Sequence, residues 1–215
     1  MAMHERRSEE ARKRVVLSAA LLHAATEGFT DRLLTEAGRD AGVDGAEIAR
    51  LFPAGVPSLL EFYSHASDEE MVGRLKAIGP AAMKVRERIS TAVMTRLEVL
   101  EPHKDAACRA AARLGLPPNL PLAARLTYAT VDAMWRAAGD VSTDFNFYTK
   151  RGILAGVYTS TLMRWFNDSD GAATRVFLAA RIENVMQYEK LKASLRREAE
   201  QGLDRFAALL RPPRR

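Results

Sequence analysis

The sequence predicts an all-α protein, and three features of its pattern support this prediction. Apolar residues recur every three or four positions along most of the chain, which is the spacing of amphipathic helices. Valine and isoleucine nowhere alternate with polar residues over the length of a strand. The nine prolines fall between the helical patterns and separate them. We therefore expect a fold of about nine helices without a sheet.

The length and composition of the chain fit a single soluble globular domain, with room for a small appendage. The 215 residues are 47% hydrophobic and 27% charged. No apolar run approaches the roughly 20 residues of a membrane-spanning helix, and the N-terminal residues lack the apolar core of a signal peptide. The single cysteine, Cys108, excludes an internal disulfide and is compatible with a reducing cytoplasm.

The first 64 residues are predicted to form a helix-turn-helix-like region. One helix is expected from Ser8 to Thr26, a second from Leu33 to Ala41 and a short third from Asp44 to Leu51. The Gly42-Val43 pair between the last two supplies the turn. This region resembles the DNA-binding head of TetR-type regulators, which carry similar residues at Gly28-Phe29, Ala41-Gly42-Val43 and Leu51-Phe52-Pro53.

The charge of this region is nevertheless wrong for DNA. From Glu36 to Glu61 there are five acidic and two basic residues, a net charge of −3. The third helix begins Asp44-Gly45-Ala46-Glu47, so its carboxylates would face phosphates and oppose the electrostatic attraction behind most DNA affinity. We expect a retained fold that does not bind DNA.

Residues 65–192 are predicted as a second, helical region, and residues 193–215 as an amphipathic basic tail. Glycine and proline separate the helical patterns at Gly79-Pro80, at Pro102 and across 117–121. The expected helices are Val56–Ile78, Ala81–Leu100, Asp105–Leu116, Leu122–Ala138, Thr149–Phe166 and a long one from Ala172 to about Leu210.

The sequence carries no recognisable catalytic motif. It lacks the HExxH and Glu-x-x-His metal patterns, the G-x-S-x-G nucleophile turn and a phosphate-binding loop. Its four histidines are scattered along the chain, and Cys108 stands in an alanine-rich setting that favours an inert thiol. We expect no enzymatic activity, no metal site and no cofactor other than a bound lipid or isoprenoid.

A family resemblance is clearest in the stretch from Ser142 to Asp170. This stretch reads STDFNFYTKRGILAGVYTSTLMRWFNDSD and is preceded by TVDAMWRAAGDVST. It resembles the COQ9 family of ubiquinone-biosynthesis accessory proteins, and the resemblance extends from about Gly28 to Tyr188. The chain departs from the family after Asp170, where the family often shows T-W-x-F-L and this sequence has Thr174-Arg175-Val176-Phe177-Leu178. The resemblance implies a TetR-like helical fold whose C-terminal bundle holds an isoprenoid or another lipid.

Two neighbouring helices are candidates for the walls of such a lipid cavity. The expected helices Leu122–Ala138 and Thr149–Phe166 carry large apolar residues beside small ones such as Ala155 and Gly156, which allow a ligand to come close to the backbone. The alternative is that the large residues are simply core. The candidate lipid-binding residues are Leu126, Val131, Met134, Trp135, Leu154, Tyr158 and Leu162.

The polar segment before the second of these helices is a candidate protein interface. Aromatic side chains flanked by charges are typical of binding hot spots. The resemblance implies that this patch docks the di-iron hydroxylase that acts on demethoxyubiquinone, with a phenylalanine here where the family often has tryptophan. The alternative is a structural turn whose aromatics staple two helices. The candidate partner-binding residues are Met134, Asp144, Phe147, Tyr148 and Arg151.

The tail carries an apolar stripe beside arginines, in a chain of net charge +5. Such a helix can lie on an anionic membrane surface, and it can equally pack against a second subunit of a homodimer. The candidate membrane-binding residues are Leu203, Phe206, Leu209, Leu210 and Arg211.

Together these observations predict a non-catalytic accessory protein of ubiquinone biosynthesis, located in the cytoplasm and peripheral to the inner membrane. It would take a polyprenyl quinone intermediate from the membrane and present it to the hydroxylase. The alternative is a TetR-type transcriptional regulator with a hydrophobic effector, which the acidic third helix disfavours.

Overall fold

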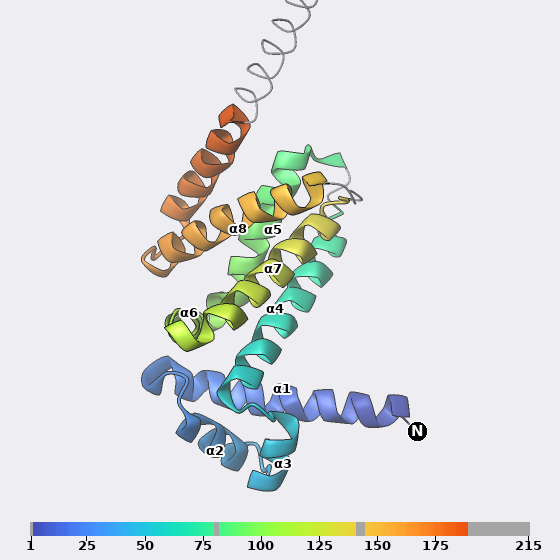
Figure 1. Ribbon diagram of the computed structural model, residues 1–215, viewed down its shortest axis with the longest axis vertical. Coiled ribbons are helices and arrows are strands. Elements are labelled where there is room, and N and C mark those ends of the chain that lie inside the picture. Colours follow the sequence, from blue (N-terminus) through green and yellow to red (C-terminus); the bar gives the residue numbers. More distant parts are fainter. Residues whose placement is uncertain (1, 80–81, 141–144, 189–215) are drawn as a thin grey trace, which may run out of the picture.

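The computed structural model describes residues 2–79, 82–140 and 145–188, and the side chains of residues 2–3 and 145–147 lie outside the description. Within these ranges every regular element is helical, as the sequence predicts (Figure 1). The α-helices are α1 (Ala2–Glu27), α2 (Asp31–Asp40), α3 (Gly45–Leu51), α4 (Val56–Ile78), α5 (Val85–Leu100), α6 (Lys104–Leu114), α7 (Leu120–Ala137) and α8 (Phe145–Phe166). One further helix covers residues 172–188, and short 3-10 turns, η2 (Glu101–His103) and η3 (Pro117–Asn119), precede α6 and α7.

The helix boundaries agree with the prediction most closely where the chain carries a clear start or stop signal. Helix α4 spans the expected residues, because Gly79 ends it in the left-handed conformation at φ +65°. Helix α5 begins at Val85, four residues later than expected, where the Glu87 side chain accepts the backbone N–H of Lys84 at 3.1 Å. Helix α7 begins two residues early because Pro121 is tolerated in a first helical turn.

The helix-turn-helix is built from two capped helices and a close contact. The Thr30 hydroxyl accepts a hydrogen bond from the backbone N–H of Leu33 at 3.3 Å and caps the start of α2. The Asp44 carboxylate accepts a hydrogen bond from the backbone N–H of Glu47 at 2.8 Å and caps the start of α3. Gly38 lets α3 approach, since a Cβ there would lie 2.8 Å from Ile48. Gly42, at φ +65°, then makes the turn that other residues rarely adopt.

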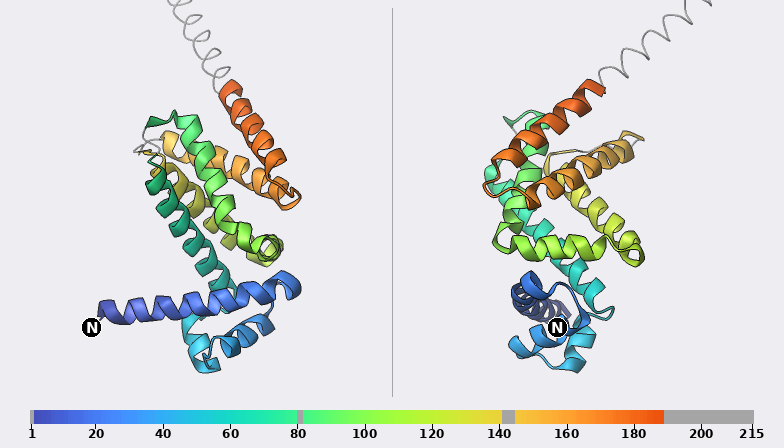
Figure 2. Two further views of the ribbon diagram at one scale, coloured as in Figure 1. Left: turned by 180° about the vertical axis from the view of Figure 1, so that it is seen from behind. Right: turned by 90° about the vertical axis from the view of Figure 1, so that its left-hand side faces the viewer.

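The helices form two connected parts with a continuous core. Helices α1–α3 lie at one end, and α4 runs from them into the bundle of α5–α8 and the 172–188 helix (Figures 1 and 2). Helix α1 packs on α2 and α6, α4 on α5 and α7, and α7 on α8. One cluster of buried apolar side chains extends from Val16 and Leu33 to Leu154 and Trp165. The predicted boundary after residue 64 therefore falls inside one uninterrupted helix, α4.

None of the helices in the described ranges combines the length and the hydropathy needed to cross a membrane. The predicted membrane-binding residues, Leu203, Phe206, Leu209, Leu210 and Arg211, lie outside the described residues. Their role stays a prediction.

Candidate functional site

A groove of about 590 Å³ lies where α5, α7, α8 and the 172–188 helix meet. Its volume is within the range of pockets that bury small organic ligands. Apolar side chains form most of its surface, and cations from α5 and α8 stand on its rim. The lining residues are Lys84, Val85, Arg86, Ile89, Trp135, Thr149, Lys150, Ile153, Leu154, Val157, Ile182, Val185 and Met186.

A shallower trough of about 380 Å³ continues the groove between α8 and the 172–188 helix. The two hollows share Ile153, Val157 and Val185. Gly156 lines the trough, and a Cβ added there would meet no atom within 4 Å. The groove and the trough together therefore form one elongated apolar strip, which we call the lipid strip.

The structure distributes the predicted lipid-binding residues over three places. Trp135 and Leu154 line the groove. Leu126, Tyr158 and Leu162 line a separate cavity of about 220 Å³ among α4–α8. Val131 and Met134 are fully buried and line neither hollow.

The expectation of one cavity lined by all seven residues was therefore wrong. Helix α8 is apolar on two faces, and consecutive residues on it point to different hollows: Val157 faces the groove and Tyr158 the separate cavity. The groove is also lined by four residues that were not among the predicted ones, Ile89, Ile182, Val185 and Met186. Their helical apolar stripes were visible in the sequence, but nothing there distinguishes a stripe that lines a groove from one that fills a core.

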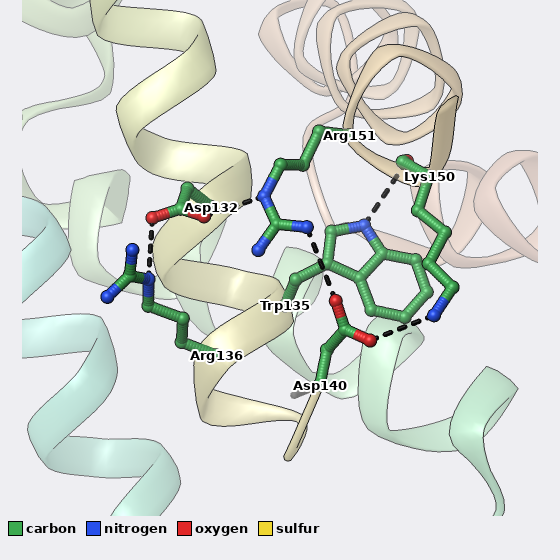
Figure 3. A network of polar contacts seen from close by, with 6 residues as sticks. All are labelled: Asp132, Trp135, Arg136, Asp140, Lys150 and Arg151. Atoms are coloured by element: carbon green, nitrogen blue, oxygen red, sulfur yellow. Dashed lines mark hydrogen bonds and ion pairs between the residues drawn. The ribbon is translucent and has the colours of Figure 1, made fainter. Parts of the chain in front are cut away.

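A buried ion-pair network fixes α8 against α7 beside the groove (Figure 3). Arg151 donates from Nε to Asp132 at 2.6 Å and from Nη1 to Asp140 at 3.3 Å. Lys150 Nζ pairs with the other Asp140 oxygen at 2.8 Å, and Arg136 Nε donates to the other Asp132 oxygen at 2.7 Å. The Arg151 side chain at the centre of the network is 1% exposed, whereas Arg136 and Lys150 at its edges are accessible to solvent.

Trp135 is held at the end of the groove by the same segment. Its indole Nε1 donates to the Lys150 backbone oxygen at 3.2 Å, and the Lys150 ammonium lies 5.5 Å from the ring centroid. Trp135 is drawn beside both Lys150 and Arg151 in Figure 3. The ring is thus fixed in position where the groove reaches the first turns of α8.

The predicted partner-binding residues differ in their exposure. Tyr148 is 67% exposed on the first turns of α8, as an interface residue needs to be. Asp144 and the side chain of Phe147 lie outside the described residues. Met134 is fully buried in the core and cannot reach a partner in this conformation. The expectation that Arg151 binds a partner is corrected as well, because its side chain is 1% exposed and donates to Asp132 and Asp140 within this chain.

The groove also depends on how the 172–188 helix is attached. One carboxylate oxygen of Asp168 accepts both the backbone N–H and the hydroxyl of Thr174, each at 2.6 Å. These hydrogen bonds from Thr174 hold the pKa of Asp168 at about 2, well below its usual range. Thr174 is fully buried, and Leu178 one turn later joins the core. The Asp168–Thr174 contact therefore positions the helix that supplies Ile182, Val185 and Met186.

In the described part of the chain, one group of potential metal ligands also comes together, at the helix-turn-helix. Single ligand atoms of His23, Glu27 and Glu36 lie within 4.8 Å of one another. His23 Nε2 is also 2.7 Å from Asp40, and Glu36 accepts from Arg32 at 2.7 Å. Glu36 Oε2 is buried without a hydrogen-bond partner. The prediction of a chain without a metal site stays a prediction.

Replacing Arg151 tests whether the network is structural. In Arg151→Ala, the Asp132 and Asp140 carboxylates lose a buried partner, so the free energy of unfolding should fall by about 3 kcal/mol. Arg136→Ala removes the 71%-exposed partner of the same Asp132 and should cost at most about 1 kcal/mol. Urea unfolding of both variants measures the difference. Equal stabilities would contradict a structural role for Arg151.

Acid unfolding tests the attachment of the 172–188 helix. Asp168 has a lower pKa in the fold, about 2, than in an unfolded chain, about 3.9. Its ionised form therefore stabilises the fold above pH ~4, and this contribution is lost as the pH falls through about 2. The stability difference between the natural chain and Asp168→Asn should shrink between pH 5 and pH 2 in chemical unfolding. A difference that stays constant over this range would contradict the assignment.

The fold itself has a counterpart among solved structures. The crystal structure of a TetR transcriptional regulator from Nitrosomonas europaea matches with a TM-score of 0.64 and 18% sequence identity, over 80% of this chain and 95% of the regulator. At that identity the likeness concerns the fold alone. The predicted TetR-like, all-α fold is confirmed.

The chain is also similar in sequence to the members of one protein family. The COQ9 family model matches residues 120–189, which contain α7, α8 and the 172–188 helix. The "Ubiquinone biosynthesis protein COQ9, mitochondrial" of Bos taurus is 35% identical over 189 residues, 83% of this chain and 59% of the relative. The proteins of that name from Rattus norvegicus and Homo sapiens are 34% and 33% identical, over 83% of this chain and 60% and 59% of the relatives. The chain spans about three fifths of the length of these relatives, and over that length it is similar to the COQ9 family.

Proposed function

We propose that this protein acts in ubiquinone biosynthesis as a non-catalytic, lipid-binding accessory protein. The observation that carries the proposal is the lipid strip, an elongated apolar surface walled by α8 and the 172–188 helix inside the part of the chain that matches the family model. The relatives are named ubiquinone biosynthesis proteins, which supports the pathway. The mostly apolar lining of the strip supports binding.

The ligand that best fits the strip is the polyprenyl chain of a quinone intermediate. A chain of isoprene units is long, narrow and apolar, and each CH₂ group removed from water contributes about 0.8 kcal/mol. The groove and the trough share Ile153, Val157 and Val185, so one chain can lie along both. Trp135 offers a fixed aromatic face at the end of the groove near α8's first turns.

The cations beside the groove suit contact with a membrane surface. Lys84 and Arg86 are exposed on the groove rim at the start of α5. A basic side chain near an anionic bilayer contributes about 1 kcal/mol to binding. The protein would lie against the membrane with this rim, take up the polyprenyl chain and later release it. In this proposal, the rim with Lys84 and Arg86 is the part of the protein that faces the membrane.

Delivery would occur at the first turns of α8. Thr149 and Lys150 line the groove, and the exposed Tyr148 directly precedes them. A di-iron demethoxyubiquinone hydroxylase bound over Tyr148 would therefore stand next to the end of the lipid strip. The ion pairs of the buried Arg151 with Asp132 and Asp140 would hold the first turns of α8 in one conformation. A segment that is already ordered loses less conformational entropy when a partner docks on it.

A TetR-type transcriptional regulator is the second candidate, and the fold likeness favours it. A hydrophobic effector would then occupy the same strip, in a homodimer. Against this candidate, the exposed start of α3 is Asp44-Gly45-Ala46, and Arg50 donates to Glu9 of α1 at 3.0 Å. The accessory role is favoured because it needs no DNA contact from this acidic helix.

Filling the trough tests lipid binding. Gly156→Phe should place a ring in the trough and reduce the lipid that co-purifies with the protein about tenfold, the equivalent of losing roughly two buried CH₂ contacts. Gly73→Phe is the matched control, because Gly73 on α4 is also exposed with open space at its Cβ. Native mass spectrometry of both variants measures the lipid. Equal lipid yields in the two variants would count against the strip as the binding site.

Truncating Tyr148 tests the docking surface. Because this side chain is 67% exposed, Tyr148→Ala should leave thermal unfolding unchanged and weaken binding to the purified hydroxylase about thirtyfold, or roughly 2 kcal/mol. Tyr128→Ala on α7, where the tyrosine is 42% exposed, is the control. Intact hydroxylase binding together with a lower melting temperature would show that Tyr148 staples the fold and would end the interface hypothesis.

A further inference from the structure

A second hollow, separate from the lipid strip, lies among α4, α5, α6, α7 and α8, and we call it the inner cavity. Its volume is about 220 Å³, and it shares no lining residue with the groove or the trough. Most of its wall is apolar, with alanines from α6 and leucines from α4 and α7. Its polar lining includes two nearly buried groups, the guanidinium of Arg96 and the hydroxyl of Tyr63.

Arg96 is held by a network that leaves one of its nitrogens without a partner. Nε donates to Asp68 at 2.8 Å, and Nη2 points to the Ser64 backbone oxygen at 3.4 Å. The other Asp68 oxygen accepts the Thr130 hydroxyl at 3.0 Å, which fixes the carboxylate. Nη1 has no hydrogen-bond partner, although the Arg96 side chain is only 4% exposed.

Tyr63 presents a second unpartnered donor to the same cavity. The residue is 8% exposed, and its hydroxyl makes no hydrogen bond. Burial raises the pKa of Tyr63 to about 12, so the hydroxyl keeps its proton and can donate at neutral pH. A buried donor left unpaired is unfavourable, and an acceptor that reaches both the Tyr63 hydroxyl and Arg96 Nη1 would satisfy two such donors.

The charges around the cavity favour a neutral acceptor. Arg96 is already balanced by Asp68 at 2.8 Å, so an anion would add an unbalanced charge in a buried place. The remaining titratable group on the cavity wall, Tyr158, is also buried, and burial raises its pKa, so it stays neutral. A carbonyl, quinone or ether oxygen meets both donors without this cost.

We propose that the inner cavity binds a small, largely apolar molecule, of about one ring, through a neutral oxygen that accepts hydrogen bonds from Tyr63 and from Arg96 Nη1. The volume of about 220 Å³ lies below the roughly 300–1,000 Å³ typical of small-molecule pockets, which favours a ligand smaller than a polyprenyl chain. Thr159 and Met163, which are exposed, mark the side of the cavity open to solvent. The inference does not depend on lipid binding in the strip, because the two sites share no residue.

Three ring compounds of similar size test the proposal on the full chain by ligand-observed NMR titration. Acetophenone carries a neutral acceptor, ethylbenzene carries none, and benzoate carries a charged one. Acetophenone should bind about three- to tenfold more tightly than ethylbenzene, and more tightly than benzoate. Equal binding of acetophenone and ethylbenzene would mean that the two donors hold only water, and tighter benzoate binding would reject the neutral acceptor. Either result overturns the proposal.

Variants assign the effect to the two donors. Tyr63→Phe keeps the ring and removes the hydroxyl, so acetophenone should lose about three- to tenfold in affinity while the melting temperature does not fall. Tyr128→Phe, on an exposed tyrosine outside the cavity, is the control and should change nothing. Arg96→Lys keeps a cation for Asp68 but removes the Nη1 donor of the guanidinium, so the affinity for acetophenone should also fall. Unchanged acetophenone affinity in folded Tyr63→Phe would overturn the assignment.

One further variant separates this proposal from the proposed function. Gly156→Phe fills the trough of the lipid strip and leaves the wall of the inner cavity intact. It should lower lipid co-purification and leave acetophenone affinity within twofold of the natural chain. An equal loss of acetophenone binding in Gly156→Phe and Tyr63→Phe would place the ring compound in the strip and reject the inner cavity as its site.

Discussion

The C-terminal bundle depends on one buried cation. Arg151 has its guanidinium between Asp132 of α7 and Asp140 just after it, and only 1% of its side chain is exposed. Removing such a charge from water is costly unless the partners are close and fixed. Here the partners also pair with Arg136 and Lys150, so neither carboxylate is left to move freely. The result is a fixed contact between α7 and α8 beside the groove.

From that junction, α8 serves two hollows of different character. Residues such as Leu154 and Val157 contribute to a long apolar groove, whereas Tyr158 and Leu162 face a small cavity with buried donors. The difference follows from the helical repeat, since neighbouring residues point about 100° apart. The groove also needs the 172–188 helix, whose attachment at Asp168 and Thr174 is short and local. Two binding environments can thus coexist on one helix without sharing a side chain.

Local signals in the sequence were enough to predict most of the fold. The Gly42 turn, the Asp44 cap and the Gly79 stop each act within a few residues, so their effects can be read from the chain. The position of Arg151 could not be predicted, because its partners stand 19 and 11 residues away and the pairing exists only once α7 and α8 pack. An arginine beside aromatics therefore looked like an exposed interface residue. Met134 was misplaced for the same reason: its burial depends on packing and not on its neighbours in sequence.

The same dependence on packing explains how a TetR-like head can lose the charge pattern of a DNA reader without losing its shape. Glu47 of α3 pairs with Arg12 of α1, and Arg50 of α3 pairs with Glu9 of α1. The charges of the would-be recognition helix are thus used to hold α1 and α3 together. Exposed pairs of this kind contribute little each, but they leave Arg50 less able to meet a phosphate.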